Sequence, residues 1–137
     1  MNRENLRTLL NGIRVLVVED EGDTRNLLAF LLEQHGATVM LADNVTYALK
    51  CFQESRPDVI LADIGMPGLN GYALIASIRK QEGTGTRRPA IALTAYSTPA
   101  DRDIALTSGF TEYLSKPFEP RELLATIRRL YDAYRAP

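Results

Sequence analysis

Five polar side chains stand directly after apolar runs of the sequence, and their types allow chemistry on an anionic group. Three are carboxylates, one is a hydroxyl and one is an ammonium group: Glu19, Asp20, Asp63, Thr94 and Lys116. Carboxylates held close together repel one another, so such a cluster either raises a carboxyl pKa or recruits a cation. The lysine supplies about one positive charge, and a hard divalent ion with oxygen ligands, Mg²⁺, supplies the rest. With both cations in place, the cluster can accept an anionic phosphoryl group.

A carboxylate is the best candidate nucleophile in this set. The sequence holds one histidine and one cysteine, His35 and Cys51, and no Ser-His or Cys-His arrangement is evident. Asp63 stands alone after an apolar run, and the segment IGMPGLNG that follows it is rich in glycine and proline, which leaves room for an incoming donor. We therefore expect Asp63 to accept a phosphoryl group, with Thr94 and Lys116 binding its oxygens after transfer.

The hydrophobic pattern predicts the elements that must bring these residues together. Apolar runs alternate with segments of helical periodicity, which indicates strand–helix units. Runs rich in β-branched residues are typical of parallel strands buried on both faces. We predict strands at Ile13–Val18, Ala37–Ala42, Asp58–Ala62, Ala90–Thr94 and Phe110–Leu114.

Helix-start signals fall between the predicted strands. Asn44 can cap one helix, Thr98 followed by proline starts another, and Glu119-Pro120 starts the last. The helix after Thr98 carries a thin apolar stripe, chiefly Ile104 and Leu106, so we expect it to be lightly anchored.

Five consecutive strand–helix units predict an α/β fold, a doubly wound parallel sheet with right-handed crossovers and helices on both faces. Ligands of such sheets bind at the carboxyl ends of the strands, near a switch in strand order. Since the five polar residues all stand at or just after predicted strand ends, we expect them to share one rim of the sheet.

Composition limits the classes of protein that fit. The 137 residues are 45% hydrophobic and 24% charged, which suits one domain with its own core and excludes a disordered tail, a collagen-like polymer and a two-domain enzyme. The net charge of −1 favours neither nucleic acid nor a membrane surface as a partner. One cysteine excludes an internal disulfide, and no apolar run is long enough for a transmembrane helix, so we expect a cytoplasmic setting.

Short motifs at the predicted strand ends together resemble those of the receiver domains of bacterial two-component response regulators. They are Glu19-Asp20 after VLVV, Asp63 followed by Met66-Pro67 and Gly71, Thr94-Ala95, and Tyr113 with Lys116-Pro117-Phe118. No motif is specific alone, but the ordered set is. The resemblance covers residues 12 to about 133, so we assign 12–137 to the receiver domain and 1–11 to an N-terminal tail or connector.

The resemblance implies a role for each residue that matches. Asp63 would be the phosphoacceptor. Asp20, Asp63 and the backbone carbonyl of Gly65 would bind Mg²⁺ directly, and Glu19, where many family members have aspartate, would bind it through water. The phosphoryl group would contact Thr94, Ala95 and Lys116.

The resemblance also implies a conformational switch. Tyr113 would rotate inward when Thr94 is drawn to the phosphate, which would remodel the face built from the helix after Thr98, the fifth strand and the last helix. Gly65 and Tyr96 occupy positions that tune phosphoryl lifetime, and we expect a moderate to long lifetime because glycine positions no water and tyrosine shields the phosphorus. The Lys116–Pro117 peptide bond would be cis. The fold would be a flavodoxin-like (βα)5 sandwich with the strand order 2-1-3-4-5.

The implied function is that of a phosphoacceptor module in a phosphorelay. A histidine kinase or histidine phosphotransfer protein would donate the phosphoryl group, and the domain would catalyse only its own phosphorylation and slow dephosphorylation. The parent would be a stand-alone regulator or, with Leu6, Leu9 and Leu10 ending a connector helix, a hybrid histidine kinase with a C-terminal receiver. The resemblance leaves open whether the domain also forms a weak homodimer.

Three other functions fit the sequence less well. A Mg²⁺-dependent phosphohydrolase with an aspartyl-phosphate intermediate would need a second acid two residues after its nucleophile, where this chain has Gly65. A nucleotide binder would need a glycine-rich cradle, but the first loop reads EDEGDT. A docking module that works without phosphorylation would not need the acceptor, metal and lysine positions that are all present.

Overall fold

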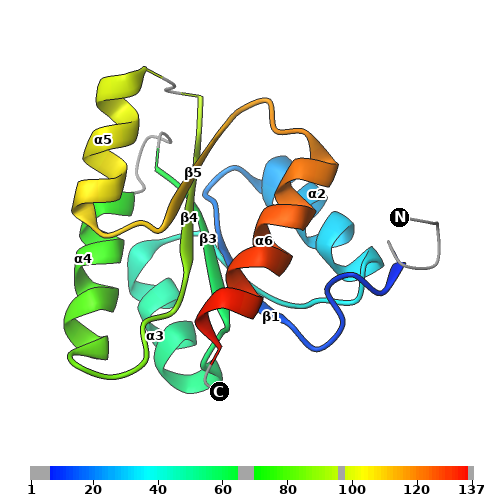
Figure 1. Ribbon diagram of the computed structural model, residues 1–137, viewed down its shortest axis with the longest axis horizontal. Helices are drawn as coiled ribbons and strands as arrows, with labels where there is room; N and C mark the ends of the chain where they lie inside the picture. Colours follow the sequence, from blue (N-terminus) through cyan, green and yellow to red (C-terminus); the bar gives the residue numbers. More distant parts are fainter. Residues whose placement is uncertain (1–6, 65–69, 96–97, 136–137) are drawn as a thin grey trace.

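Five strands and five helices alternate along the part of the chain that the computed structural model describes, residues 7–64, 70–95 and 98–135 (Figure 1). The strands are β1 (Arg14–Val18), β2 (Thr38–Ala42), β3 (Val59–Asp63), β4 (Ala90–Thr94) and β5 (Glu112–Ser115). The helices are α2 (Gly22–Gln34), α3 (Val45–Ser55), α4 (Gly71–Glu82), α5 (Pro99–Ser108) and α6 (Pro120–Tyr134).

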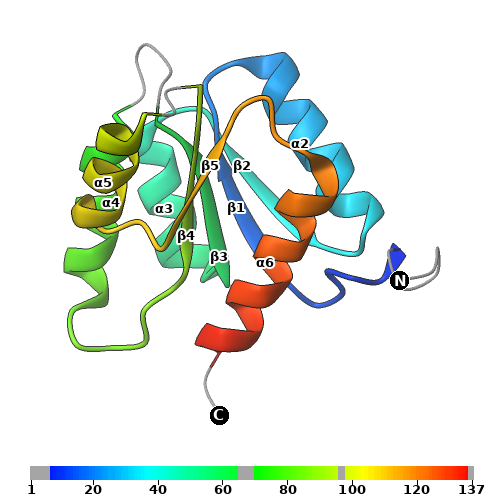
Figure 2. The ribbon, with the colours of Figure 1, turned by 45° about the horizontal axis from the view of Figure 1, so that its top comes forward.

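The strands form one parallel sheet of order β2-β1-β3-β4-β5, which confirms the predicted flavodoxin-like arrangement. Helices α2 and α6 cover one face, and α3, α4 and α5 cover the other (Figures 1 and 2). Alternate residues of β1 serve the two faces, because Val15 and Val17 belong to the core under α2 and α6 whereas Leu16 and Val18 belong to the opposite core. A sheet buried in this way on both sides explains the unbroken apolar runs of the sequence.

The predicted helix starts are confirmed by their capping bonds. The side chain of Asn44 accepts a hydrogen bond from the Tyr47 amide (2.8 Å), and Glu119 accepts one from the Glu122 amide (2.9 Å). Thr98 and Asp101 form a reciprocal capping box at the start of α5. The Lys116–Pro117 peptide bond is cis, as the resemblance implied.

Two details of the predicted elements are wrong. The fifth strand begins at Glu112 rather than Phe110, because the Phe110 amide bonds the Ala105 carbonyl (3.2 Å) and so closes the turn that ends α5. Ile104 does not anchor α5, since it is 52% exposed and Ala105 is the residue of this helix that is buried. The expectation of a lightly anchored helix is nevertheless confirmed.

Residues just before β1 are tied to the body of the domain. Leu10 is fully buried in the core shared by α2 and α6, and its amide donates to the His35 carbonyl (2.8 Å). The Arg128 guanidinium of α6 donates to the Leu9 carbonyl (3.3 Å). This segment therefore joins the end of α2 to α6. In the described part of the chain, no helix is both long and apolar enough to cross a membrane.

Candidate functional site

The register of the sheet brings the predicted polar residues to one rim. Val18 of β1 pairs with Ala62 of β3, so the next residues, Glu19 just after β1 and Asp63 at the end of β3, stand at neighbouring strand ends. Asp63 in turn pairs with Leu93, and Thr94 follows at the end of β4. Since Thr94 pairs with Ser115 of β5, the next residue, Lys116, stands at the same rim.

The ammonium group of Lys116 binds two buried carboxylates. Its Nζ donates to Asp63 Oδ2 and lies 3.7 Å from Glu19 Oε1. Asp63 is 3% exposed and Glu19 is 1% exposed, so water screens neither charge well. The Lys116 amide donates to the Thr94 carbonyl (2.8 Å), which fixes the lysine backbone against β4. One lysine thus faces more negative charge than it can balance.

This shortage of positive charge appears in the pKa of Glu19, which is raised from 4.5 to about 8. Burial is the main cause, and the neighbouring Asp63 adds to it, because a protonated Glu19 can donate a hydrogen bond to that carboxylate. Lys116 opposes the shift, and Asp20 adds a smaller repulsion. In the metal-free protein at neutral pH, this shift favours the protonated form of Glu19.

The donor atoms at this rim suit a hard cation. Both carboxylate oxygens of Glu19 and Oδ1 of Asp20 are buried, and none has a hydrogen-bond partner in the described structure. Buried acceptors of this kind need a proton or a cation. Within residues 7–64, 70–95 and 98–135, no three His, Cys, Asp or Glu side chains close into a ready metal cage. Mg²⁺ needs no such cage, because it uses one or two carboxylates and keeps several waters.

The next acidic residue, Glu21, does not join the cluster. Its carboxylate caps α2 by accepting hydrogen bonds from the amides of Asp23 (3.0 Å) and Thr24 (2.6 Å). A hydrogen bond with the Thr24 side chain, and then the bonds from these two amides, lower the pKa of Glu21. Arg25, one turn into α2, donates to the Glu19 carbonyl (3.0 Å). No sequence motif predicted this contact, and only the position of a cation in the first turn after the acidic pair could have indicated it.

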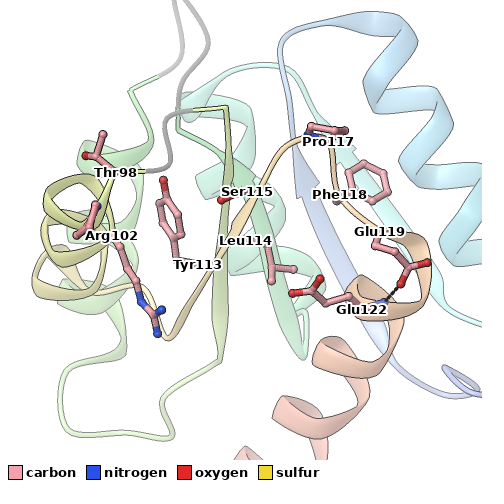
Figure 3. A pocket seen from close by; sticks show the side chains of 10 residues that line it. Thr98, Arg102, Tyr113, Leu114, Ser115, Pro117, Phe118, Glu119 and Glu122 are labelled. Atoms are coloured by element: carbon pink, nitrogen blue, oxygen red, sulfur yellow. Dashed lines mark hydrogen bonds between the residues drawn. The ribbon is translucent and has the colours of Figure 1, made fainter.

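The two predicted switch residues lie on neighbouring strands. Thr94 is fully buried at the end of β4, and Tyr113 on β5 is 9% exposed. Ala95 follows Thr94 and is exposed. Beside Tyr113, a groove of about 480 Å³ runs over β5 between the starts of α5 and α6 (Figure 3). The groove therefore lies next to Tyr113, on the face of α5, β5 and α6 that the resemblance implies as the switch face.

Gly71 begins α4 in contact with the residue that follows Asp63. A Cβ at position 71 would lie 3.0 Å from the Cα of Ile64 and closer still to its side chain, so only glycine fits. The remaining predicted positions in this loop region, Gly65, Met66 and Pro67, and Tyr96 in the next loop, lie outside the described residues. Their roles stay predictions.

Comparison with known proteins identifies the family. Residues 15–128 match the model of the response regulator receiver domain. The uncharacterized 14.6 kDa protein in the sodA1 3′ region of Leptolyngbya boryana is 44% identical over 115 residues, which cover 84% of this chain and 87% of that protein. The phosphate regulon transcriptional regulatory protein PhoB of Escherichia coli is 37% identical over 115 residues, which cover 84% of this chain and 50% of PhoB. The chain thus spans about half the length of PhoB.

Solved structures agree with the sequence relatives. The receiver domain of the Francisella response regulator 1452 superposes with a TM-score of 0.82 at 30% identity, covering 90% of this chain and all of that chain. The receiver domain of the sensor histidine kinase PA1611 from Pseudomonas aeruginosa PAO1 gives 0.79 at 35% identity, covering 88% and 98%, and holds a magnesium ion in its active site cleft. The chain belongs to the response regulator receiver domains, the phosphoacceptor signalling modules of two-component systems.

Proposed function

We propose that Asp63 is the phosphoacceptor of this receiver domain and that its phosphorylation requires Mg²⁺. The observation that carries the proposal is a carboxylate only 3% exposed, at the carboxyl end of the central strand β3 and bonded to Lys116. In the reaction, a carboxylate oxygen of Asp63 forms a bond to phosphorus while the phosphorus–nitrogen bond of a phosphohistidine donor breaks. The electron pair of that bond stays on the donor imidazole.

The neighbouring residues bind and orient the phosphoryl group. Lys116 holds one oxygen of Asp63 and is placed to pair with a phosphoryl oxygen, and the Thr94 hydroxyl and the Ala95 amide would bind the others. Asp20, Asp63 and the Gly65 carbonyl would hold Mg²⁺, with Glu19 reaching it through water. Bound Mg²⁺ supplies positive charge that offsets the carboxylates and the incoming phosphoryl oxygens.

We propose that the module signals rather than turning over a separate substrate. A phosphohydrolase of the aspartyl-phosphate type would need an acid two residues after Asp63, where Gly65 has no side chain, and we expect Tyr96 to shield the phosphorus. Phosphorylation would draw Thr94 toward the phosphate and change the face of α5, β5 and α6. This grooved face is the surface through which a weak homodimer would form.

Two exposed apolar residues mark where a cytoplasmic donor would dock. Leu27 is 57% exposed and Phe30 is 62% exposed, both on α2, which begins two residues after Asp20. A histidine kinase or histidine phosphotransfer protein that covers this pair would bring its phosphohistidine to the rim. Changing both residues to serine is expected to slow transfer from a phosphorylated phosphotransfer protein and to leave phosphorylation by a small acyl phosphate unchanged.

Binding of beryllofluoride, a stable mimic of a phosphoryl group on a carboxylate, tests the proposed site. Amide resonances at the ends of β3, β4 and β5 should shift when beryllofluoride and Mg²⁺ are both present. Asp63→Asn should abolish these shifts, because the amide cannot form the bond. Equal shifts in Asp63→Asn, or shifts that persist in a chelator, would contradict the assignment.

A further inference from the structure

The hydroxyl of Tyr113 is buried without a hydrogen-bond partner among the described residues. The ring is 9% exposed and the hydroxyl points toward the start of α5, where Thr98 lies (Figure 3). A buried hydroxyl with no partner is costly, because it has lost its hydrogen bonds to water. This arrangement of the ring therefore favours any movement that brings an acceptor to the hydroxyl.

The first turn of α5, toward which the hydroxyl points, carries the carboxylate of Asp101. Its Oδ2 already accepts hydrogen bonds from the Thr98 hydroxyl (2.7 Å) and the Thr98 amide (3.3 Å). A carboxylate offers about four acceptor positions, so the cap of α5 leaves capacity for another donor. After burial, the charge of Asp101 is the next largest cause that raises the pKa of Tyr113.

The start of α5 is able to move. Ala105 is the residue of this helix that is buried, and Ile104 is half exposed, so a shift of the helix uncovers little apolar surface. Thr98, the capping residue of α5, follows Thr94 by only four positions in the sequence.

We infer that the carboxylate of Asp101 accepts a hydrogen bond from the Tyr113 hydroxyl in the phosphorylated state. The inference rests on the proposed function, in which phosphorylation of Asp63 draws Thr94 toward the site. The capping box of α5 would then travel toward β5 and give the buried hydroxyl its partner. Asp101 is thus a positioning residue that joins the cap of one helix to the switch tyrosine.

Tyr72 on α4 supplies a matched control. It packs against the same core as Tyr113, is half-buried, and also has its pKa raised by burial and by Asp101. Its hydroxyl is not among the buried groups that lack a partner. Removing this hydroxyl tests whether any phenol near Asp101 matters or only that of Tyr113.

The experiment is a double-mutant cycle on the affinity for beryllofluoride in the presence of Mg²⁺. Tyr113→Phe and Asp101→Ala are each expected to weaken binding about tenfold, the worth of a hydrogen bond to a charged group. The double variant should bind no more weakly than either single variant, and Tyr72→Phe should bind like the parent. The carboxyl ¹³C resonance of Asp101 should shift on binding in the parent but not in Tyr113→Phe.

The outcomes separate this inference from the proposed function. Losses that add in the double variant, a loss in Tyr72→Phe equal to that in Tyr113→Phe, or an Asp101 resonance that does not move would overturn the inference while the acceptor site stands. A parent protein that does not bind beryllofluoride with Mg²⁺ would overturn the proposed function and this inference with it.

Discussion

Replacing Glu19 with glutamine is expected to stabilise the metal-free protein at neutral pH. The Glu19 side chain is 1% exposed and lies beside Asp63, and its pKa is raised from 4.5 to about 8. Glutamine keeps the shape of the side chain and carries no charge at any pH. Its amide is also able to donate to Asp63, so the variant removes the titration and little else.

The sign and size follow from the proton that the folded state retains. Between pH 4.5 and about 8, folded Glu19 holds a proton that the unfolded chain has released, so the free energy of unfolding falls as pH rises. The contribution of Glu19 is complete below pH 4.5 and lost as pH rises through about 8. The slope is about 1.4 kcal/mol per pH unit, which amounts to about 3 kcal/mol at neutral pH.

Chemical denaturation of both proteins in a chelator measures this effect. The stability difference between Glu19→Gln and the parent should grow steadily with pH from about 5 to about 8. Saturating Mg²⁺ should reduce the difference, because a cation at the rim favours the ionised Glu19 of the parent. A difference that stays constant with pH would refute the reasoning, since it would mean that Glu19 does not titrate in this range.

Three further substitutions test other parts of the structure. Lys116→Met leaves Asp63 and Glu19 without their cation, so the free energy of unfolding at neutral pH should fall by about 3 kcal/mol and phosphorylation by an acyl phosphate should slow. An unchanged denaturation curve and an unchanged rate would contradict the pairing. Gly71→Ala forces a Cβ against Ile64 and should cost about 1–3 kcal/mol in urea unfolding, whereas an equally stable variant would show that the loop yields. Arg79→Ala removes hydrogen bonds to the Gly109 and Arg88 carbonyls and to Glu82, which should cost about 2–4 kcal/mol, and Arg79→Lys should recover only part of the loss.

The sheet could be predicted from the sequence because each strand is buried on both faces. Runs such as the one at Val15–Val18 have no polar residue that could face solvent, which restricts them to the interior of a parallel sheet. The sequence does not fix the strand ends in this way, since they depend on turns. The amide of Phe110 bonds back to α5, and no local pattern in the sequence separates that from the start of a strand.

The site could be predicted because parallel strands present their carboxyl ends at one rim. Asp63, Thr94 and Lys116 needed only the correct strand order to come together. The raised pKa of Glu19 could not be predicted in the same way. It depends on how completely the side chain is buried and on the distance of Lys116 from two carboxylates, and both are properties of the packed rim.

Contacts between segments far apart in the chain could not be predicted from the sequence either. Leu10 lies in the core although it precedes the first strand. Its amide bonds the His35 carbonyl at the end of α2, and its side chain packs in the core under α2 and α6. Arg79 reaches from α4 to Gly109, thirty positions away, and holds the end of α5. Periodicity describes one element at a time, so it carries no signal for such contacts.

Phosphorylation by a small acyl-phosphate donor, followed by intact mass, tests the central assignment most directly. The parent protein should gain one phosphoryl group when Mg²⁺ is present and none when it is chelated, and Asp63→Asn should gain none under either condition. A phosphoryl adduct that forms without Mg²⁺ and survives the loss of the Asp63 carboxylate would contradict the account.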